Sequence, residues 1–172
     1  MIVNDVIFNE HKSLKTKDKF HIIQGKLKGG HSDIVVGIDP GVNFGMTIIS
    51  AGYIQVIYGK FPTEHRVGWH GIHIYEWMIK YFEDIYLPGR AIVEGAAYHS
   101  KYGQPLLEEV RFAFFLALHN LGFQVEIVPP ATIRKVVFNN GKQQAGEWWP
   151  WLNHNGADSL SIALYALEEH AK

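Results

Sequence analysis

Residues 35–41 read VVGIDPG, an apolar run that stops at the carboxylate of Asp39 and a Pro-Gly turn. A short apolar run bounded by turn residues predicts a buried β-strand, here over 34–39. Two more strand-like runs follow at 46–50 and 53–58, with a turn at Ala51-Gly52 between them. These three runs predict an antiparallel meander whose first strand ends at Asp39.

Helical spacing of apolar residues dominates the chain after residue 65, and short apolar runs separate the helical segments. Apolar residues at intervals of three and four predict helices with one buried face. The predicted helices cover 66–85, 107–121, 131–138 and 157–170, and the predicted strands between them cover 91–94 and 124–128. This order predicts an α/β fold: a mixed five-stranded sheet, three antiparallel strands first, with helices on both faces.

Residues 1–33 differ from the rest of the chain, because they are polar and carry six lysines against four acidic residues. We interpret 1–33 as a weakly basic N-terminal extension and 34–172 as one domain. A length of 172 residues and an apolar content of 47% agree with a single sizeable core.

Composition excludes several classes of protein. The chain has no cysteine, which excludes disulfide frameworks, zinc ribbons, thiol nucleophiles and iron–sulfur clusters, so that a metal must bind oxygen or imidazole. A net charge of −1 argues against a protein that coats polyanions by bulk charge. No apolar run approaches the length of a membrane span, and the N-terminus does not resemble a signal peptide. We therefore expect a soluble, cytoplasmic protein with no membrane partner.

Three acidic residues, Asp39, Glu94 and Asp158, lie at the ends of predicted elements. Ligands of open α/β sheets bind beyond the strand ends, and a carboxylate beside a buried run is costly unless it is paired or binds a metal. Each acid also has a simpler interpretation. Asp39 could belong only to a turn, Glu94 could be an exposed strand end, and Asp158 could lie in the first turn of a helix that Asn155 caps. Their chemical value depends on the fold bringing them together.

Four blocks of sequence occur in a recognisable order. They are IDPG at 38–41 with Gly45, VEG at 93–95, VPPATIRK at 128–135 running to NGK at 140–142, and GADSLSIA at 156–163. In this order they resemble RuvC, the Holliday junction resolvases of the RNase H-like superfamily, over about residues 34–170. The resemblance implies an RNase H-like fold and a homodimer that acts in DNA recombination and repair. It also implies a cytoplasmic location, either associated with the nucleoid or, if the protein is of phage origin, in the host cell. Such a dimer nicks paired strands of a four-way DNA junction.

The resemblance also implies a metal site, since Asp39, Glu94 and Asp158 match the metal-binding acids of the family. Two Mg²⁺ ions, with Mn²⁺ as a substitute, fit oxygen ligands and phosphodiester hydrolysis, and no nucleotide cofactor is implied. The family places a fourth ligand, an acid or a histidine, where this chain has Asn155. Asn155 could supply a neutral oxygen, or the neighbouring His154 could bind; His154 could also shuttle a proton or be an ordinary surface histidine.

DNA contacts follow from the same resemblance. The family uses an aromatic residue in the loop after the second acid, which makes Tyr98 the candidate wedge and Tyr102 the alternative, with Lys101 beside them; the loop could equally be a polar lid. The block after Pro129-Pro130 holds bases that match DNA-contacting positions, although basic residues on an exposed helix are commonly only solvated. These bases are Arg134, Lys135 and Lys142.

Two apolar features are open to several interpretations. Trp148, Trp149 and Trp151 could stack on bases, close the core or form a dimer contact, and we favour packing in the core or a dimer. We expect the dimer surface to use the helix over 107–121, with Phe112 and Phe115 exposed on it.

Three other functions share some of these sequence features with a junction-resolving nuclease. Actin-like ATPases also begin with a strand, an Asp and a Gly-rich turn, but they need a second phosphate loop and about twice this length. A relative that binds branched DNA without cutting it would not need three intact acids. A nuclease for flaps or RNA–DNA hybrids would share the chemistry, and a cleavage assay separates it.

Overall fold

The structure is a computed structural model that describes residues 2–8, 14–15, 20–28, 34–61, 69–83, 89–95 and 104–170. The strands are β1 (Val6–Ile7), β2 (Leu14–Lys15), β3 (His21–Leu27), β4 (Val35–Asp39), β5 (Asn43–Ser50), β6 (Tyr53–Lys60), β7 (Arg90–Glu94) and β8 (Gln124–Val128). The α-helices are α1 (Trp69–Phe82), α2 (Gln104–Asn120), α3 (Pro130–Phe138) and α4 (His154–His170), and the short 3₁₀ helices are η1 (Ile2–Asp5) and η2 (Ala145–Glu147).

The sheet contains the predicted five strands, in the order β6-β5-β4-β7-β8. The strands β4, β5 and β6 are antiparallel neighbours, whereas β7 pairs parallel with both β4 and β8. The predicted fold class, a mixed α/β sheet with an antiparallel meander first, is therefore confirmed. The predicted number of strands is wrong, because the described part of the chain forms an eight-stranded sheet.

The additional strands come from residues before 34. Strand β3 pairs antiparallel with β6, and both β1 and β2 pair with β3. Along β3 the side chains of Ile23 and Leu27 are buried while Gln24 and Lys26 are exposed. This alternation is typical of a β-strand, but the polar composition of residues 1–33 favoured an extension without strands. The interpretation of 1–33 as a separate extension stays a prediction, but β3 continues the sheet of the main domain.

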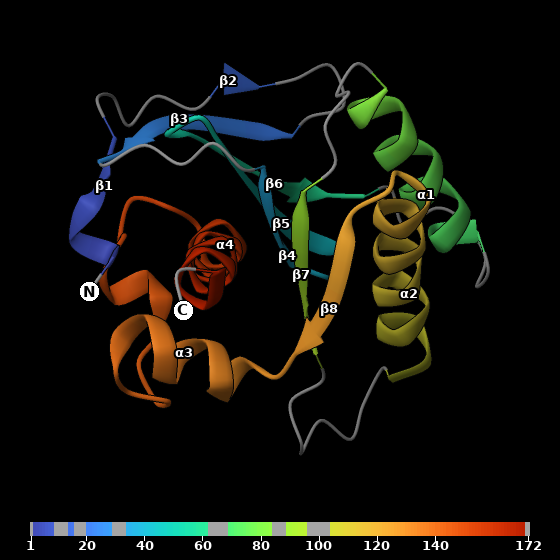
Figure 1. Ribbon diagram of the computed structural model, residues 1–172. Helices are drawn as coiled ribbons and strands as arrows, with labels where there is room; N and C mark the ends of the chain where they lie inside the picture. Colours follow the sequence, from blue (N-terminus) through green and yellow to red (C-terminus); the bar gives the residue numbers. More distant parts are fainter. Residues whose placement is uncertain are drawn as a thin grey trace.

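Helices cover both faces of the sheet, as predicted. Figure 1 shows α1 and α2 side by side on one face, and α4 on the other face with α3 beside it. Each face has its own hydrophobic cluster: Ile38, Val93 and Phe114 belong to the cluster under α1 and α2, and Val35 and Ile92 belong to the cluster under α4. Successive residues of β4 and β7 therefore point alternately into the two clusters.

Helix α4 packs directly on β4 and β5. A Cβ atom built on Gly37 would lie 2.3 Å from the main-chain nitrogen of Ala163, and one built on Gly45 would lie 1.9 Å from the main-chain oxygen of Asn155. Both glycines are needed because the helix backbone occupies the space of a side chain. Thr47 and Ser159 share a buried hydrogen bond of 2.9 Å across the same interface.

The start of α4 differs from the prediction. The helix begins at His154, three residues earlier than predicted, so Asp158 lies in its second turn and does not open the helix. The side chain of Asn153 accepts a hydrogen bond of 2.8 Å from the N–H of Gly156. Asn153 is therefore the N-cap, and the predicted cap at Asn155 is wrong, because Asn155 is already inside the first turn.

The three tryptophans pack against other aromatic rings. Trp149 is buried in the core, with 3% of its surface exposed. Trp148 stacks on Phe138 at 6.0 Å, and Trp151 meets Phe8 edge-on at 6.3 Å. The predicted packing role of these rings is confirmed for Trp149.

None of the helices that the structure describes has the length and apolarity of a membrane span.

Candidate active site

Strand register brings two of the three acids together. The parallel pairing of β4 with β7 sets Ile38 opposite Val93, so the next residues, Asp39 and Glu94, lie side by side at the carboxyl end of the two strands. By strand alternation Asp39 points to the same face as Gly37, which is the face that α4 covers. Two carboxylates therefore share one end and one face of the sheet.

Helix α4 supplies the third acid from above the sheet. The close contact between Asn155 and Gly45 holds the first turn of α4 against the strand next to Asp39, since Gly45 pairs with Asp39 in the sheet. Asp158, one helical turn further, is 5% exposed. The three acids are 55 and 64 residues apart in the sequence, and the tertiary structure brings their charges within interaction range.

The three acids are close enough to influence one another's ionisation. Burial raises the pKa of Asp39 well above its usual range, and the charges of Glu94 and Asp158 raise it further. Burial, followed by the charge of Asp158, raises the pKa of Glu94 to about 7. Burial also raises the pKa of Asp158. Each carboxylate is therefore costly to ionise in the absence of a bound cation.

Two positively charged or protonatable side chains face this group. Arg134 of α3 lowers the pKa of all three acids, although burial outweighs it. His154, at the first position of α4, lies 3.2 Å from a carboxylate oxygen of Asp158, and 73% of its side chain is exposed. His154 is therefore beside Asp158, and the charge of Arg134, which the sequence associated only with DNA, also acts on the three acids.

The residue types fit a divalent cation. Three carboxylates supply the hard oxygen ligands that Mg²⁺ prefers, and within the described ranges no lysine or arginine forms an ion pair with them. In the same ranges no three acidic or histidine side chains are close enough to form a ready-made metal cage.

A residue that sequence analysis missed contacts this site from the other face of the sheet. Arg111 of α2 is 7% exposed, and its Nε donates a hydrogen bond of 2.9 Å to the main-chain oxygen of Glu94. The charge of Arg111 also lowers the pKa of Glu94. The only signal in the sequence is Pro40, which follows Asp39 and has no N–H to pair with a neighbouring strand.

The remaining predicted residues are distributed as follows. Asn155 is half-buried in the first turn of α4, beside β5. Lys135 is exposed on α3 and Lys142 is exposed in the turn that follows it. The residues expected in the loop after Glu94 lie outside the described part of the chain; these are Tyr98, Lys101 and Tyr102.

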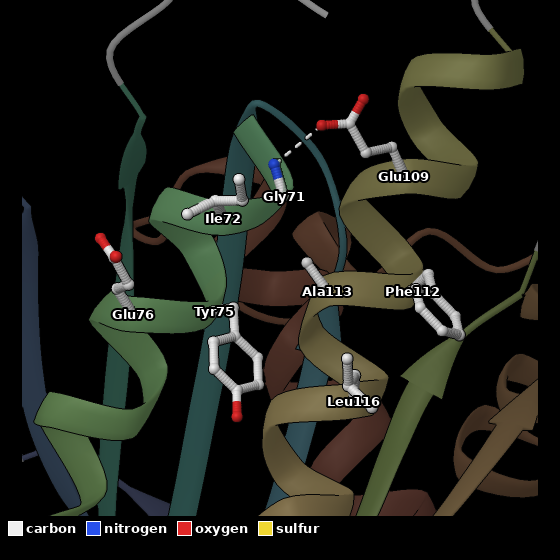
Figure 2. A pocket seen from close by; sticks show the side chains of 8 residues that line it. All are labelled: Gly71, Ile72, Tyr75, Glu76, Glu109, Phe112, Ala113 and Leu116. Atoms are coloured by element: carbon white, nitrogen blue, oxygen red, sulfur yellow. Dashed lines mark hydrogen bonds between the residues drawn. The ribbon is translucent and has the colours of Figure 1, made fainter. Parts of the chain in front are cut away.

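An apolar groove of about 430 Å³ lies between α1 and α2, away from the acids. Figure 2 shows Ile72 and Tyr75 of α1 opposite Phe112 and Leu116 of α2. Phe112 is 62% exposed and Ile72 is 50% exposed. The helices are joined at one end of the groove, where the N–H of Gly71 donates to a carboxylate oxygen of Glu109 at 2.8 Å.

Comparison with known proteins is informative at the level of the fold. No protein-family model matches the sequence, and no curated protein matches it. Among solved structures, Thermus thermophilus RuvC in complex with a Holliday junction substrate superposes with a TM-score of 0.67 at 16% identity, covering 80% of this chain and 94% of that one. The chain has a RuvC-like fold.

A second structure of Thermus thermophilus RuvC gives the same result, with a TM-score of 0.62, 17% identity and coverage of 80% of this chain and 95% of the other. The RuvC-like fold therefore extends over nearly the whole length of the bacterial protein. It confirms the fold that the sequence resemblance predicted.

Proposed function

We propose that this protein is a metal-dependent, structure-selective DNA endonuclease that resolves four-way junctions by paired symmetric nicks. The observation that carries the proposal is that Asp39 and Glu94 lie at the ends of neighbouring parallel strands, while the first turns of α4, which carries Asp158, pack on the adjacent strand β5. The charge of Asp158 raises the pKa of both Asp39 and Glu94. A RuvC-like fold around this group supports a junction as the substrate, because one of the similar structures is a RuvC complex with a Holliday junction.

The proposed metal ligands are Asp39, Glu94 and Asp158, with Asn155 or His154 completing the set. Divalent Mg²⁺ or Mn²⁺, when bound, supplies positive charge beside the scissile phosphate and favours ionisation of an attacking water. The protein orients these ligands by strand register and by the packing of α4 on Gly45.

Other side chains would hold the DNA and move protons. Arg134 carries a fixed charge toward the acids and suits a phosphate oxygen near the cleaved bond. His154, exposed beside Asp158, is placed to give a proton to the leaving oxygen. Lys135 and Lys142 would contact the DNA backbone further away, and the loop with Tyr98, Lys101 and Tyr102 would meet the centre of the junction.

Paired nicks require two active sites, so we propose a two-fold homodimer. The groove between α1 and α2 is the proposed contact surface, since Ile72 and Phe112 expose apolar area there. Phe112 fits this role better than Phe115, which is half-buried and stacks on His119 of the same helix. We propose a cytoplasmic location, associated with the nucleoid or, if the protein is of phage origin, in the host cell.

Incubation with labelled four-way junction, linear duplex, flap and RNA–DNA hybrid tests the proposal, each with Mg²⁺, Mn²⁺ or EDTA. We expect symmetric nicks in the junction only, and none in EDTA. Asp39→Asn should reduce cleavage by about a thousandfold or more while junction binding persists, because it removes one carboxylate ligand and leaves the shape of the site.

The possible outcomes separate the candidate functions. Preferred cleavage of flaps or hybrids would keep the nuclease and change its substrate. Tight binding of the junction without cleavage under any metal condition would identify a branched-DNA-binding protein. Full activity of Asp39→Asn would refute the assigned site.

A further inference from the structure

Arg111 of α2 is a buried cation that contacts the proposed metal site through a main-chain atom. Its Nε donates to the oxygen of Glu94 at 2.9 Å, while another guanidinium nitrogen pairs with Glu108, one helical turn earlier, at 2.5 Å. A guanidinium that is 7% exposed is costly to bury unless its hydrogen bonds are formed. The question is why the Glu94 carbonyl requires a donor from a helix.

The strand pairing explains it. The N–H of Arg90 donates to the oxygen of Ile34 on the β4 side, and main-chain groups alternate sides along a strand, so Glu94 also turns its carbonyl toward β4. The N–H of Gly95 donates instead to Val128 on β8 at 2.8 Å, as this alternation requires. The donor for the Glu94 carbonyl should therefore come from the end of β4.

That donor does not exist in this sequence. With Ile38 opposite Val93, the residue whose N–H would reach the Glu94 carbonyl is residue 40, and residue 40 is proline, which has no N–H. A buried carbonyl without a partner is destabilising, and the end of a strand without its ladder bond is free to change direction. The Nε of Arg111 donates to the same carbonyl oxygen that the missing ladder donor would have reached.

We infer that Arg111 is a positioning residue: it replaces the hydrogen bond that Pro40 removes and thereby fixes the direction in which the Glu94 side chain is presented to the metal. Glu108 holds the guanidinium in place for this contact. The inference deepens the proposed function and rests on it, since it takes Glu94 to be a metal ligand. Arg111 itself touches neither metal nor DNA in this proposal.

The experiment is calorimetric titration of the metal-free protein with Mn²⁺, a measurement that does not depend on cleavage. Arg111→Met removes both the donor and the charge, whereas Arg111→Gln removes the charge but keeps an N–H donor at the same distance along the side chain. We expect Arg111→Met to weaken Mn²⁺ binding by about tenfold or more, as for other residues that orient metal ligands. We expect Arg111→Gln to stay within about threefold of the unmodified protein.

Arg90→Met is the matched control. Arg90 lies at the other end of β7 and pairs with Glu126 of β8 at 2.8 Å, so its loss should leave Mn²⁺ affinity unchanged. Where Arg111→Met does not fold, Glu108→Ala tests the positioning role of Arg111 instead. Glu108 is 58% exposed, so its truncation should not unfold the protein, and its loss removes the ion pair that holds the Arg111 guanidinium. We then expect weakening by about tenfold, well beyond the threefold range set for Arg111→Gln.

The outcomes are distinguishable from those of the proposed function. Unchanged Mn²⁺ affinity in Arg111→Met, or in Glu108→Ala where it replaces that variant, would overturn the positioning role while leaving the nuclease intact. Equal weakening in Arg111→Met and Arg111→Gln would also overturn it, because the charge and not the hydrogen bond would then matter. An unmodified protein that neither binds Mn²⁺ nor cuts any substrate would overturn both proposals.

Discussion

At the scale of single residues, the proposed chemistry depends on carboxylates held where ionisation is unfavourable. Glu94 illustrates the cost, because burial and the charge of Asp158 raise its pKa from 4.5 to about 7 despite two opposing arginines. In the folded protein this side chain prefers its protonated form up to about neutral pH. A bound cation would stabilise the ionised carboxylate and lower its pKa. The electrostatic cost that destabilises the ionised, metal-free protein would therefore favour metal binding.

Glu94→Gln should make the metal-free protein more stable at high pH. A raised pKa of an acid in the folded state means that stability is lost as pH rises from 4.5 through about 7. The variant avoids this loss, which amounts to about 3 kcal/mol for a shift of this size, and the two proteins should be equally stable near pH 4. Urea unfolding in EDTA at several pH values measures the difference.

Glu83→Gln is the matched control, since Glu83 is exposed after α1. It should follow the pH dependence of the unmodified protein. Parallel stability curves for Glu94→Gln and the unmodified protein between pH 4 and pH 8 would contradict the prediction.

At the scale of secondary structure elements, α4 and the end of β4 determine where the acids lie. The apolar runs and helical spacings predicted these elements within a few residues, because burial of one face imposes a period that the sequence displays. The start of α4 was predicted three residues late because Asn153, not Asn155, caps it, and both residues have the same capping chemistry. Helix ends depend on local competition that periodicity does not reveal.

Gly45→Ala should move α4 and impair the site. The new Cβ would lie 1.9 Å from the main-chain oxygen of Asn155, and a backbone atom cannot rotate away as a flexible side chain can. We expect destabilisation by about 2–3 kcal/mol or more, as for other overpacked interfaces, with loss of cleavage because Asp158 shifts with the helix. Thermal unfolding and junction cleavage measure the two effects.

Gly146→Ala in η2 provides the comparison, because a Cβ there meets nothing within 4 Å. It should leave stability unchanged or slightly raised. Equal stability of Gly45→Ala and Gly146→Ala would show that α4 does not press on β5 as the structure indicates.

At the scale of the whole molecule, the sheet extends beyond the five strands that the sequence predicted. Strand β3 covers the edge of β6 and buries Ile23 in the cluster beneath α4, so the part of the N-terminal segment that forms β3 belongs to the packed structure. On the opposite side of the molecule, α1 and α2 leave an apolar groove between them (Figure 2). One edge is thus closed by the chain itself, and one surface is available to a second copy.

Ile23→Ala should destabilise the fold although it lies in the polar N-terminal segment. Ile23 is 2% exposed, and truncation of a buried isoleucine to alanine costs about 2–4 kcal/mol. Gln24→Ala, the adjacent exposed position on β3, should cost far less. Chemical denaturation of both variants measures this, and equal midpoints would mean that β3 contributes nothing to the core.

Phe112→Glu should convert the proposed dimer into a monomer. A charge at a side chain that is 62% exposed is harmless in a monomer but is desolvated in a two-fold contact, where it also meets its own copy. Tyr53→Glu is the control, because Tyr53 is 64% exposed at the start of β6 and does not line the groove. Sedimentation velocity distinguishes the two states, and an unmodified protein that is already monomeric would refute this interface.

The order of elements, the two-faced layering and the identity of the acids were readable along the chain, because each follows from local apolar spacing and from the residues that interrupt it. The proximity of Asp39, Glu94 and Asp158 was visible only in the tertiary structure. It depends on strand register and on the glycines that let α4 approach the sheet, and both are relations between distant segments. Arg111 belongs to the same category. Its purpose depends on a hydrogen bond that Pro40 cannot form on a neighbouring strand, and only the three-dimensional pairing of β4 with β7 makes that missing bond visible.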